Sequence, residues 1–342
     1  MYYRYRKLDN KPSFYSVLAK IAVFLAVMVI MLGAYTRLKE AGLGCPDWPG
    51  CYGRMVLPSA APALEAAQKV YPNIPIEPAK AWAEMVHRYF AGTLGMLLWV
   101  LAIWGMARRK HHPEQPVVLP WLLIALGGFQ AVLGMWTVTL KLLPLVVTGH
   151  LLGGMAIASC LLWVALKTSP SPSPVSSECA ALKPWIIGGL IILAVQIFAG
   201  AWTSTNYAAL ACPEFPFCQG TLFPPMHWQE AFNLLNPIGP NYEGGRLALA
   251  ARVTIQMAHR YGAFITFLFF VPLSCVMISR ARYHAVRKLG WALLILLAIQ
   301  ITLGIVNVVA LLPLSNAVLH NGVAAILLLT VVATLYRCSR RE

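Results

Sequence analysis

The sequence predicts an all-α membrane protein with eight transmembrane helices, arranged as two tandem four-helix bundles related by an internal duplication. Two observations lead to this fold class. Hydrophobic residues make up 59% of the 342 residues and charged residues only 11%, a composition typical of polytopic membrane proteins and not of soluble domains. In addition, short motifs of the first half recur in the second half at a nearly constant offset, which indicates a repeat.

Four histidines mark this repeat. His87 begins a His-Arg-Tyr sequence, and His259 begins the same sequence at an offset of 172 residues (259 − 87). His150 is matched by His320 at an offset of 170 residues (320 − 150). Each half also has a Cys-x5-Cys pair before its first histidine. The pairs are Cys45 with Cys51 and Cys212 with Cys218.

Apolar runs long enough to cross about 30 Å of hydrocarbon as a helix occur four times in each half, some of them interrupted by glycine or proline. The expected spans are 17–37, 82–106, 117–139, 146–167, 184–204, 251–278, 288–310 and 315–336. The chain then divides into an N-terminal segment, a first four-helix repeat, a linker, a second four-helix repeat and a tail. Their ranges are 1–16, 17–167, 168–183, 184–336 and 337–342.

Basic residues gather on one side of this topology. If the N-terminus is cytoplasmic, the outer segment 205–250 holds only Arg246 as a basic residue, and the outer segment 38–81 offsets its basic residues with acidic ones. The inner basic residues are Arg4, Arg6, Lys7, Lys11, Arg108, Arg109, Lys110, Arg280, Arg282, Arg287, Lys288, Arg337, Arg340 and Arg341. This distribution follows the positive-inside rule and accounts for the net charge of +15 without a nucleic-acid partner.

We therefore expect a multi-pass protein of the bacterial inner (plasma) membrane, with both termini cytoplasmic and the cysteine loops periplasmic. The start of the chain has no signal-peptide cleavage pattern and no long transit segment.

This orientation places both Cys-x5-Cys pairs outside, where disulfides form and persist. A Cys45–Cys51 or Cys212–Cys218 bond would staple its loop and stabilise it by about 2 kcal/mol. A small proline-rich ring also suits reversible thiol exchange, so a structural and a redox role both remain open, the redox role more for the first pair. The other cysteines are expected only to pack. They are Cys160 and Cys275 within spans, and Cys179 and Cys338 on the reducing side.

The four repeated histidines all lie near the outer ends of spans that run in the same direction. Ionisable side chains are expensive in hydrocarbon, so four at symmetry-related positions predict a function. Two histidines at similar depth on neighbouring helices can face one another across a four-helix bundle, the arrangement needed for bis-imidazole ligation of a planar iron macrocycle. Arg88 and Arg260, each next to a histidine, are placed to pair with porphyrin propionates.

The two halves differ at one position near the histidines. Glu84 precedes His87 by three residues, and the corresponding residue before His259 is the neutral Gln256. A carboxylate on the same helix face as His87 can take a proton or orient an oxidised group. The first half therefore looks like a reaction site and the second like a cofactor clamp, unless Glu84 only caps its helix.

Several sequence motifs together resemble those of the haem A synthase family. They are Tyr35-Thr36-Arg37, the first-loop segment from Gly42 to Gly53 with Cys45-Pro46-Asp47-Trp48-Pro49 and Cys51, Glu84-x-x-His87-Arg88, and the segment 212–220. The resemblance covers about residues 15–336 and leaves 54–81 and 221–250 without a matching motif.

This resemblance implies a haem-dependent membrane oxidoreductase that converts haem O to haem A by oxidising its C8 methyl to a formyl group. It implies that His259 and His320 hold a haem b cofactor, and that His87 and His150 flank the substrate haem. It also implies that Glu84 takes part in the oxidation and that Cys45 and Cys51 assist. A haem O synthase and an electron donor are the further partners to consider, besides membrane lipid.

The residues alone leave other classes open. A di-haem, quinol-linked membrane cytochrome b would also need four histidines, although Glu84 against Gln256 disfavours two equivalent haems. A membrane thiol oxidoreductase would explain the cysteine pairs but not the histidines. A repeat-built transporter lacks an evident ion site.

Overall fold

Eight helices in the described part of the chain are long and apolar enough to cross a membrane. The structure is a computed structural model that describes residues 13–57, 61–72, 75–170, 177–234, 239, 241–280 and 284–339. The long helices are α1 (Phe14–Leu38), α3 (Pro78–Arg109), α4 (Val118–Thr139), α5 (Pro144–Thr168), α6 (Ser177–Thr205), α8 (Leu249–Arg280), α9 (His284–Val309) and α10 (Leu314–Ser339). The all-α fold with eight spans predicted from the sequence is therefore confirmed.

Some of the basic residues used to orient the chain lie outside the described residues. These are Arg4, Arg6, Lys7, Lys11, Arg282, Arg340 and Arg341. The expected segments 1–16, 168–183 and 337–342 are described only in part for the same reason.

Most of the long helices extend a few residues beyond the predicted spans, whereas α4 lies within its span. α3 begins at Pro78, because proline at the first helical position has a suitable φ and lacks only an N–H that would be unpaired there. It ends at Arg109, after two arginines in its last turn, where positive charge complements the helix dipole. Polar ends of this kind prolong a helix past its apolar run.

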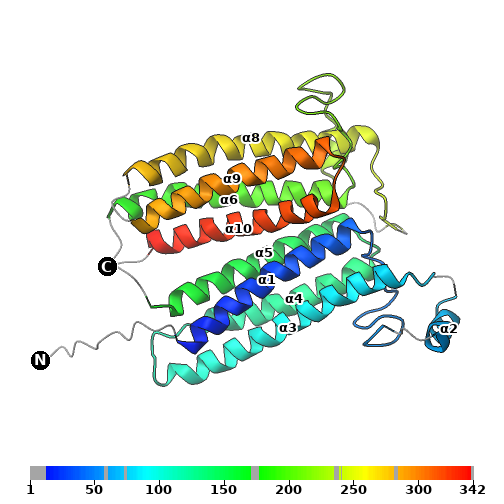
Figure 1. Ribbon diagram of the computed structural model, residues 1–342, viewed down its shortest axis with the longest axis horizontal. Coiled ribbons are helices and arrows are strands. Elements are labelled where there is room, and N and C mark those ends of the chain that lie inside the picture. The colour runs from blue at the N-terminus through cyan, green and yellow to red at the C-terminus, as the bar shows by residue number, and fades with distance from the viewer. Residues whose placement is uncertain are drawn as a thin grey trace, which may run out of the picture.

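The long helices form two bundles of four, which lie one above the other in Figure 1. In the first bundle, α1 and α4 each pack against both α3 and α5. In the second bundle, α6 and α9 each pack against both α8 and α10. Within each bundle, α3 and α5, or α8 and α10, therefore occupy opposite corners, and these are the four helices that carry the repeated histidines.

The two bundles meet along α1, α5, α6 and α10. At one end of this contact, Arg37 Nη2 donates to the carbonyl of Ser204 at 2.6 Å, and the Arg37 guanidinium lies 4.0 Å from the ring centre of Tyr207. The hydroxyls of Thr148 and Thr205 are 3.3 Å apart and buried. These contacts join the end of α1 and the start of α5 to the end of α6.

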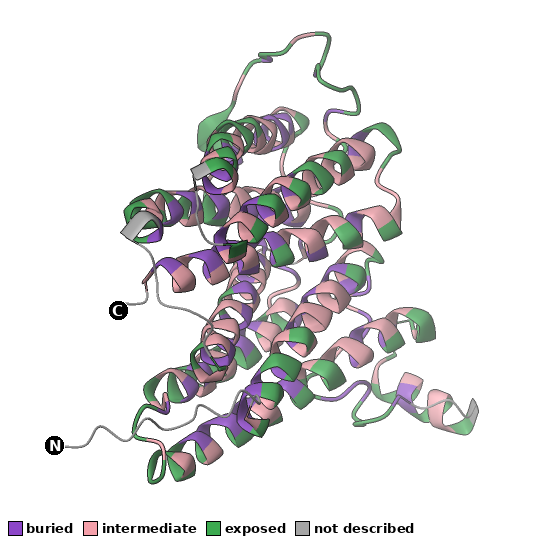
Figure 2. Ribbon diagram, turned by 60° about the vertical axis from the view of Figure 1, so that its left-hand side comes forward, coloured by how far each residue is buried: buried purple, intermediate pink, exposed green. Residues whose placement is uncertain are grey.

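The outward surfaces of the helices are apolar, as expected of lipid-facing helices. Figure 2 shows buried residues on the inward faces of the bundles and exposed residues on the outward faces. Large apolar side chains are among the exposed ones, for example Phe24 at 69%, Trp99 at 51% and Ile191 at 59% exposure. Such exposure is costly in water but favourable in hydrocarbon.

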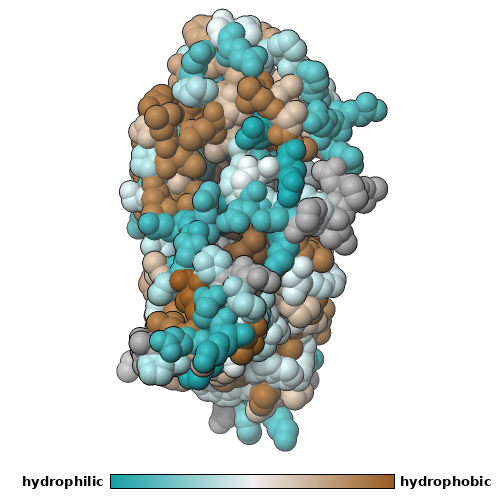
Figure 3. Space-filling view, turned by 90° about the vertical axis from the view of Figure 1, so that its right-hand side faces the viewer, coloured by the Kyte–Doolittle hydropathy of each residue, from teal (hydrophilic) through white to brown (hydrophobic). Residues whose placement is uncertain are grey.

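Two long connections, 39–77 and 206–248 in their described parts, and two short ones, 140–143 and 310–313, lie at one end of both bundles, which we call the loop end. α1 begins and α10 ends at the opposite, terminal end (Figure 1). Figure 3 looks onto the loop end and shows hydrophilic and hydrophobic side chains intermixed there. The loop end also contains two short helices, α2 (Ala61–Val70) and α7 (Trp228–Ala231).

The structure corrects one expectation about the cysteines. Cys179, near the start of α6, and Cys338, near the end of α10, form a disulfide at the terminal end and are only 3% and 2% exposed. We had expected both residues merely to pack, because they were assigned to the reducing side. Cys160 and Cys275 are free; Cys160 is half-buried and Cys275 is exposed.

Candidate functional site

Each of the four repeated histidines lies against a glycine of a neighbouring helix. A Cβ atom at Gly33 of α1 would lie 3.0 Å from Cε1 of His87, and one at Gly200 of α6 would lie 3.0 Å from Cε1 of His259. The same holds for the other two, at 3.3 Å for Gly134 of α4 against His150 and 3.1 Å for Gly304 of α9 against His320. The glycines make room for imidazole rings inside the bundles, so the repeated glycines and histidines form four matching cradles.

In the first bundle the two histidines face one another across opposite corners. The ring centres of His87 on α3 and His150 on α5 are 6.4 Å apart, in an edge-on orientation. Nδ1 of each ring is buried and has no hydrogen-bond partner in the described part of the chain. Buried ring nitrogens without partners are uncommon in folded proteins, and they indicate that these rings are shaped to meet something else.

Glutamines surround the second pair. Gln196 Nε2 of α6 lies 3.0 Å from Nδ1 of His259 and also donates to the His259 carbonyl at 3.0 Å. Gln300 Nε2 of α9 lies 3.2 Å from Nε2 of His320. Nδ1 of His320 is buried without a partner among the described residues. Gln130, which corresponds to Gln300, has its Nε2 buried and unpartnered.

The first cysteine loop folds directly onto α3. Cys45 and Cys51 form a disulfide, and both residues are fully buried. The backbone N–H of Cys45 donates to Oε2 of Glu84 at 2.9 Å. The other oxygen, Oε1, accepts a hydrogen bond from Arg88 Nη2, one turn further along α3. Glu84, which is 5% exposed, is thus held between the loop and an arginine.

Asp47 holds the same loop in shape from within. Its carboxylate accepts hydrogen bonds from the backbone N–H groups of Tyr52 at 2.6 Å and Gly53 at 2.8 Å. Gly53 adopts a φ of 72°, which favours glycine. Burial, with smaller contributions from the carboxylates of Glu77, Glu84 and Asp47, raises the pKa of the Tyr52 phenol above its ordinary value. The loop is therefore a fixed cover over the start of α3.

Arg88 is the main contact between this loop and the helix. Its Nη1 donates to the carbonyls of Asp47 at 2.9 Å and Pro49 at 3.2 Å, and also to that of Gly50. Arg260 plays the same part in the second half. It donates to the carbonyl of Cys212 at 2.6 Å and, through its other nitrogen, to two further carbonyls of that loop. Both arginines are thus engaged with loop backbone.

The second loop also contains a disulfide, between Cys212 and Cys218. It differs from the first where α8 meets it. Gln256, the counterpart of Glu84, is 4% exposed, and its Oε1 has no partner in the described part of the chain. The two halves therefore share a loop held by an arginine, but only the first half has a buried carboxylate beneath it.

Glu84 is not a helix cap, which had been the alternative to a chemical role. α3 begins at Pro78 with Glu77 in the N-cap position, so Glu84 lies almost two turns inside the helix. Sequence spacing placed Glu84 and His87 on one face of the helix. It gave no indication that Cys45 and Arg88 would be the partners of Glu84, because such contacts depend on how the loop folds.

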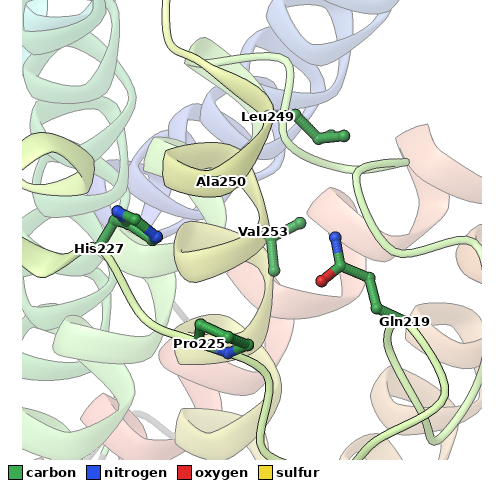
Figure 4. A pocket seen from close by; sticks show the side chains of 6 residues that line it. All are labelled: Gln219, Pro225, His227, Leu249, Ala250 and Val253. Atoms are coloured by element: carbon green, nitrogen blue, oxygen red, sulfur yellow. The ribbon is translucent and has the colours of Figure 1, made fainter.

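A separate pocket lies beside the start of α8 and the loop that follows the second disulfide (Figure 4). Its lining consists of Gln219, Pro225, His227, Leu249, Ala250 and Val253. None of these residues was predicted as a site residue. Within the described residues, no group of three or more His, Cys, Asp and Glu side chains is arranged to hold a metal ion.

The fold and these residues define a multi-pass helical membrane protein with paired histidines inside each of two bundles. A family model described as "Cytochrome oxidase assembly protein" matches residues 16–332. The chain is 46% identical over 320 residues to a haem A synthase of Shewanella oneidensis, covering 93% of this chain and 95% of that protein. It is 30% identical to a haem A synthase of Beijerinckia indica (94% and 91% coverage) and 27% identical to one of Granulibacter bethesdensis (92% and 84% coverage).

The chain therefore belongs to the haem A synthase family. The resemblance stated from the sequence is confirmed, and with it the class of enzyme, an oxidoreductase of haem A biosynthesis.

Proposed function

We propose that the protein oxidises the C8 methyl of haem O to a formyl group, with haem O bound between His87 and His150 in the first bundle. We propose further that His259 and His320 hold a haem b cofactor in the second bundle. The observation that supports this assignment is the difference between Glu84 and Gln256. The buried carboxylate of Glu84 can take part in a reaction in the first bundle, whereas the neutral Gln256 at the matching position fits a site that only binds a cofactor.

The histidines fit an iron macrocycle in spacing and surroundings. Two imidazoles on opposite sides of one metal ion, each bonded at about 2 Å, have ring centres about 6 Å apart. The rings of His87 and His150, at 6.4 Å, are close to that value. Unpartnered Nδ1 atoms on His87, His150 and His320 also suit rings that await a ligand. The glycine opposite each ring keeps the imidazole close to its helix neighbour.

A bound haem supplies the redox chemistry, because amino-acid side chains cannot take up electrons from a methyl group. The side chains of the first bundle bind and orient the substrate and handle protons. With dioxygen as the oxidant and two electrons from the donor, each hydroxylation of the methyl takes up two protons and releases one water, and a second hydroxylation gives a geminal diol that loses water to leave the aldehyde. Glu84 is the one buried carboxylate beside His87, and we assign proton transfer to its oxygens.

The first cysteine loop supports Glu84 in this proposal. The Cys45 N–H holds Oε2, and the Cys45–Cys51 disulfide keeps that N–H in place. Arg88 fixes the other oxygen and the loop carbonyls together. We therefore assign Arg88 and Arg260 to positioning the loops, in addition to the propionate contacts expected from the sequence. A thiol-exchange role for Cys45 and Cys51 predicts that serine at either position abolishes turnover while the loop stays folded.

We infer that the loop end faces the periplasm and the terminal end the cytoplasm. Among the described residues, Arg108, Arg109, Arg287, Lys288 and Arg337 lie towards the terminal end, as the positive-inside rule requires. Haem O then binds near the periplasmic side of the inner membrane. It is supplied by the enzyme that makes it, and an electron donor completes the reaction.

Haem extraction from the purified protein, followed by chromatography, tests this function. We expect one haem b per chain together with substoichiometric haem O or haem A. Two stoichiometric haems b would contradict the proposal and favour a di-haem cytochrome, and absence of any haem would contradict both.

A further inference from the structure

We infer that Gln196 is a positioning residue that holds the imidazole of His259 and sets the stability of the cofactor in the second bundle. This inference rests on the proposed function of that bundle as a haem b site. Nothing in the family resemblance or in the sequence motifs assigned a role to Gln196.

Gln196 holds His259 at two points. Its Nε2 lies 3.0 Å from Nδ1 of the ring and donates to the carbonyl of the same residue at 3.0 Å. One amide group therefore ties the ring to its own backbone, so the ring cannot rotate without breaking a buried hydrogen bond. Gly200, one turn further along α6, contacts Cε1 of the ring. Gln196 and Gly200 therefore both lie against His259 on a single face of α6.

A glycine makes room for the amide. A Cβ atom at Gly262 of α8 would lie 2.2 Å from Oε1 of Gln196, far inside contact distance. Any larger residue at position 262 would push the amide out of its place. The Gln196 amide therefore occupies space that is free because residue 262 is a glycine.

The first bundle lacks both members of this pair. At the offsets of the repeat, Val29 corresponds to Gln196 (196 − 167) and Phe90 corresponds to Gly262 (262 − 172). The valine side chain has no hydrogen-bonding group, so in the first bundle only the backbone of Val29, and no side-chain amide, can meet the His87 ring. Gly33, however, is kept opposite His87, as Gly200 is opposite His259. The two halves thus share the histidine and its facing glycine and differ in the amide and its space.

This difference follows the two roles proposed for the bundles. A ligand histidine whose second nitrogen is hydrogen-bonded keeps its ring orientation and basicity, which strengthens metal binding. A permanent cofactor benefits from that restraint, whereas a substrate that must leave as product does not. Gln196 also has an unpartnered Oε1 in the described structure. When the other ring nitrogen is a ligand, the amide can turn about its terminal bond, so that Oε1 accepts from Nδ1–H in exchange for the hydrogen bond to the His259 carbonyl.

Haem loss from the full-length purified protein tests the inference. Transfer of haem b to an excess of apomyoglobin is followed spectroscopically for the unchanged protein and for Gln196→Met and Gln196→Val. Methionine keeps the length of the side chain and removes the hydrogen bonds, and valine is the residue of the first bundle. We expect haem loss to become about 10–100-fold faster in both, the usual effect of removing a partner of a ligand histidine.

Two further variants separate the possible causes. Gln196→Glu, which can still accept from Nδ1–H, should retain haem b and lower its midpoint potential, because a stronger acceptor makes the imidazole a stronger donor. Val29→Met, the matched change in the first bundle, should leave haem b loss unchanged. If Gln196→Val does not fold, Gln196→Met and Gln196→Glu carry the test.

Unchanged haem loss in Gln196→Met, with rapid loss in His259→Ala, would overturn the inference and leave the proposed haem b site standing. Unchanged haem loss in both variants would overturn the haem b site as well. Equal acceleration by Val29→Met and Gln196→Met would reduce Gln196 to a packing residue.

Discussion

The buried carboxylate of Glu84 accepts a hydrogen bond from the backbone N–H of Cys45 at 2.9 Å. A residue of the first loop and a residue of a membrane-spanning helix, 39 positions apart, thereby form one unit. The disulfide of Cys45 and the ion pair of Glu84 with Arg88 extend this unit on both sides. Glu84 is the only member that can exchange a proton, so chemistry and loop structure can be tested separately.

Glu84→Gln gives the first half the residue that the second half already has at Gln256. The amide keeps the size of the side chain and loses the negative charge and the ability to take a proton. We expect haem A formation to fall about 10²–10⁴-fold, with haem b retained and haem O or a hydroxylated intermediate accumulating. Extraction and chromatography of the haems from the purified variant measure this. Normal haem A output from a folded Glu84→Gln protein would reduce Glu84 to a structural residue.

The histidines of the two bundles should respond differently to alanine. His259→Ala or His320→Ala is expected to remove bound haem b, because a bis-histidine site then keeps only half of its axial ligands. His87→Ala or His150→Ala should leave haem b in place and abolish haem A production. Absorption spectra of the four purified variants give the comparison. A low-spin haem spectrum that persists in both His259→Ala and His320→Ala would move the cofactor out of the second bundle.

Much of this fold was predictable because it depends on local sequence. Membrane spans require long apolar runs, and four histidines at repeated offsets stand out where charged residues are rare. The helix α2 could also have been found, since Ala61–Val70 is rich in alanine, leucine, glutamate, glutamine and lysine, which favour helices. It was not among the predicted elements, because its ten residues are too few to span a membrane.

Contacts between distant segments could not be predicted in the same way. Cys179 and Cys338 are 159 residues apart, and they meet because α6 packs beside α10, which no local pattern reveals. Arg88 was expected to pair with propionates, because its neighbour is a histidine. Its contacts with the carbonyls of Asp47, Pro49 and Gly50 depend on the shape of the first loop. The residues could be identified from the sequence, but their contact partners are determined by the tertiary structure.

The glycines opposite the histidines provide a third test. Gly200→Ala would place a methyl group 3.0 Å from Cε1 of His259, closer than ordinary contact. The ring must shift, and overpacking of this kind costs about 1–3 kcal/mol. We expect a lower haem b content and a lower thermal midpoint. Gly188→Ala on the same helix is the control, because its nearest neighbour would be 3.6 Å away, at Phe269. Equal haem b content in the two variants would contradict a cradle at Gly200.

The disulfide between Cys179 and Cys338 should stabilise the second bundle, because it ties the start of α6 to the end of α10. Disulfides typically contribute about 2–4 kcal/mol, and helices that stay inserted in the membrane when unfolded favour the lower value. The Cys179→Ser, Cys338→Ser double variant is expected to unfold at lower denaturant than the oxidised protein. Maleimide labelling without reductant reports whether the bond exists in membranes. Full labelling of both thiols there would show that this stabilisation is absent in the cell.

Arg88→Met separates the ion pair from the chemistry. Arg88 and Glu84 have side chains only 12% and 6% exposed, so methionine at 88 leaves a buried carboxylate with no counter-charge, held by hydrogen bonds from the backbone of the first loop. Removing one partner of a buried pair costs about 3–5 kcal/mol. Adding Glu84→Gln to Arg88→Met should recover most of the lost free energy of unfolding, because a neutral amide needs no counter-charge. Arg260→Met, above the neutral Gln256, loses only loop contacts and should be milder. Unfolding in detergent titrations is measured for the unchanged protein, Arg88→Met, Glu84→Gln, the double variant and Arg260→Met, and additive effects of Arg88→Met and Glu84→Gln would show that the two side chains are not coupled.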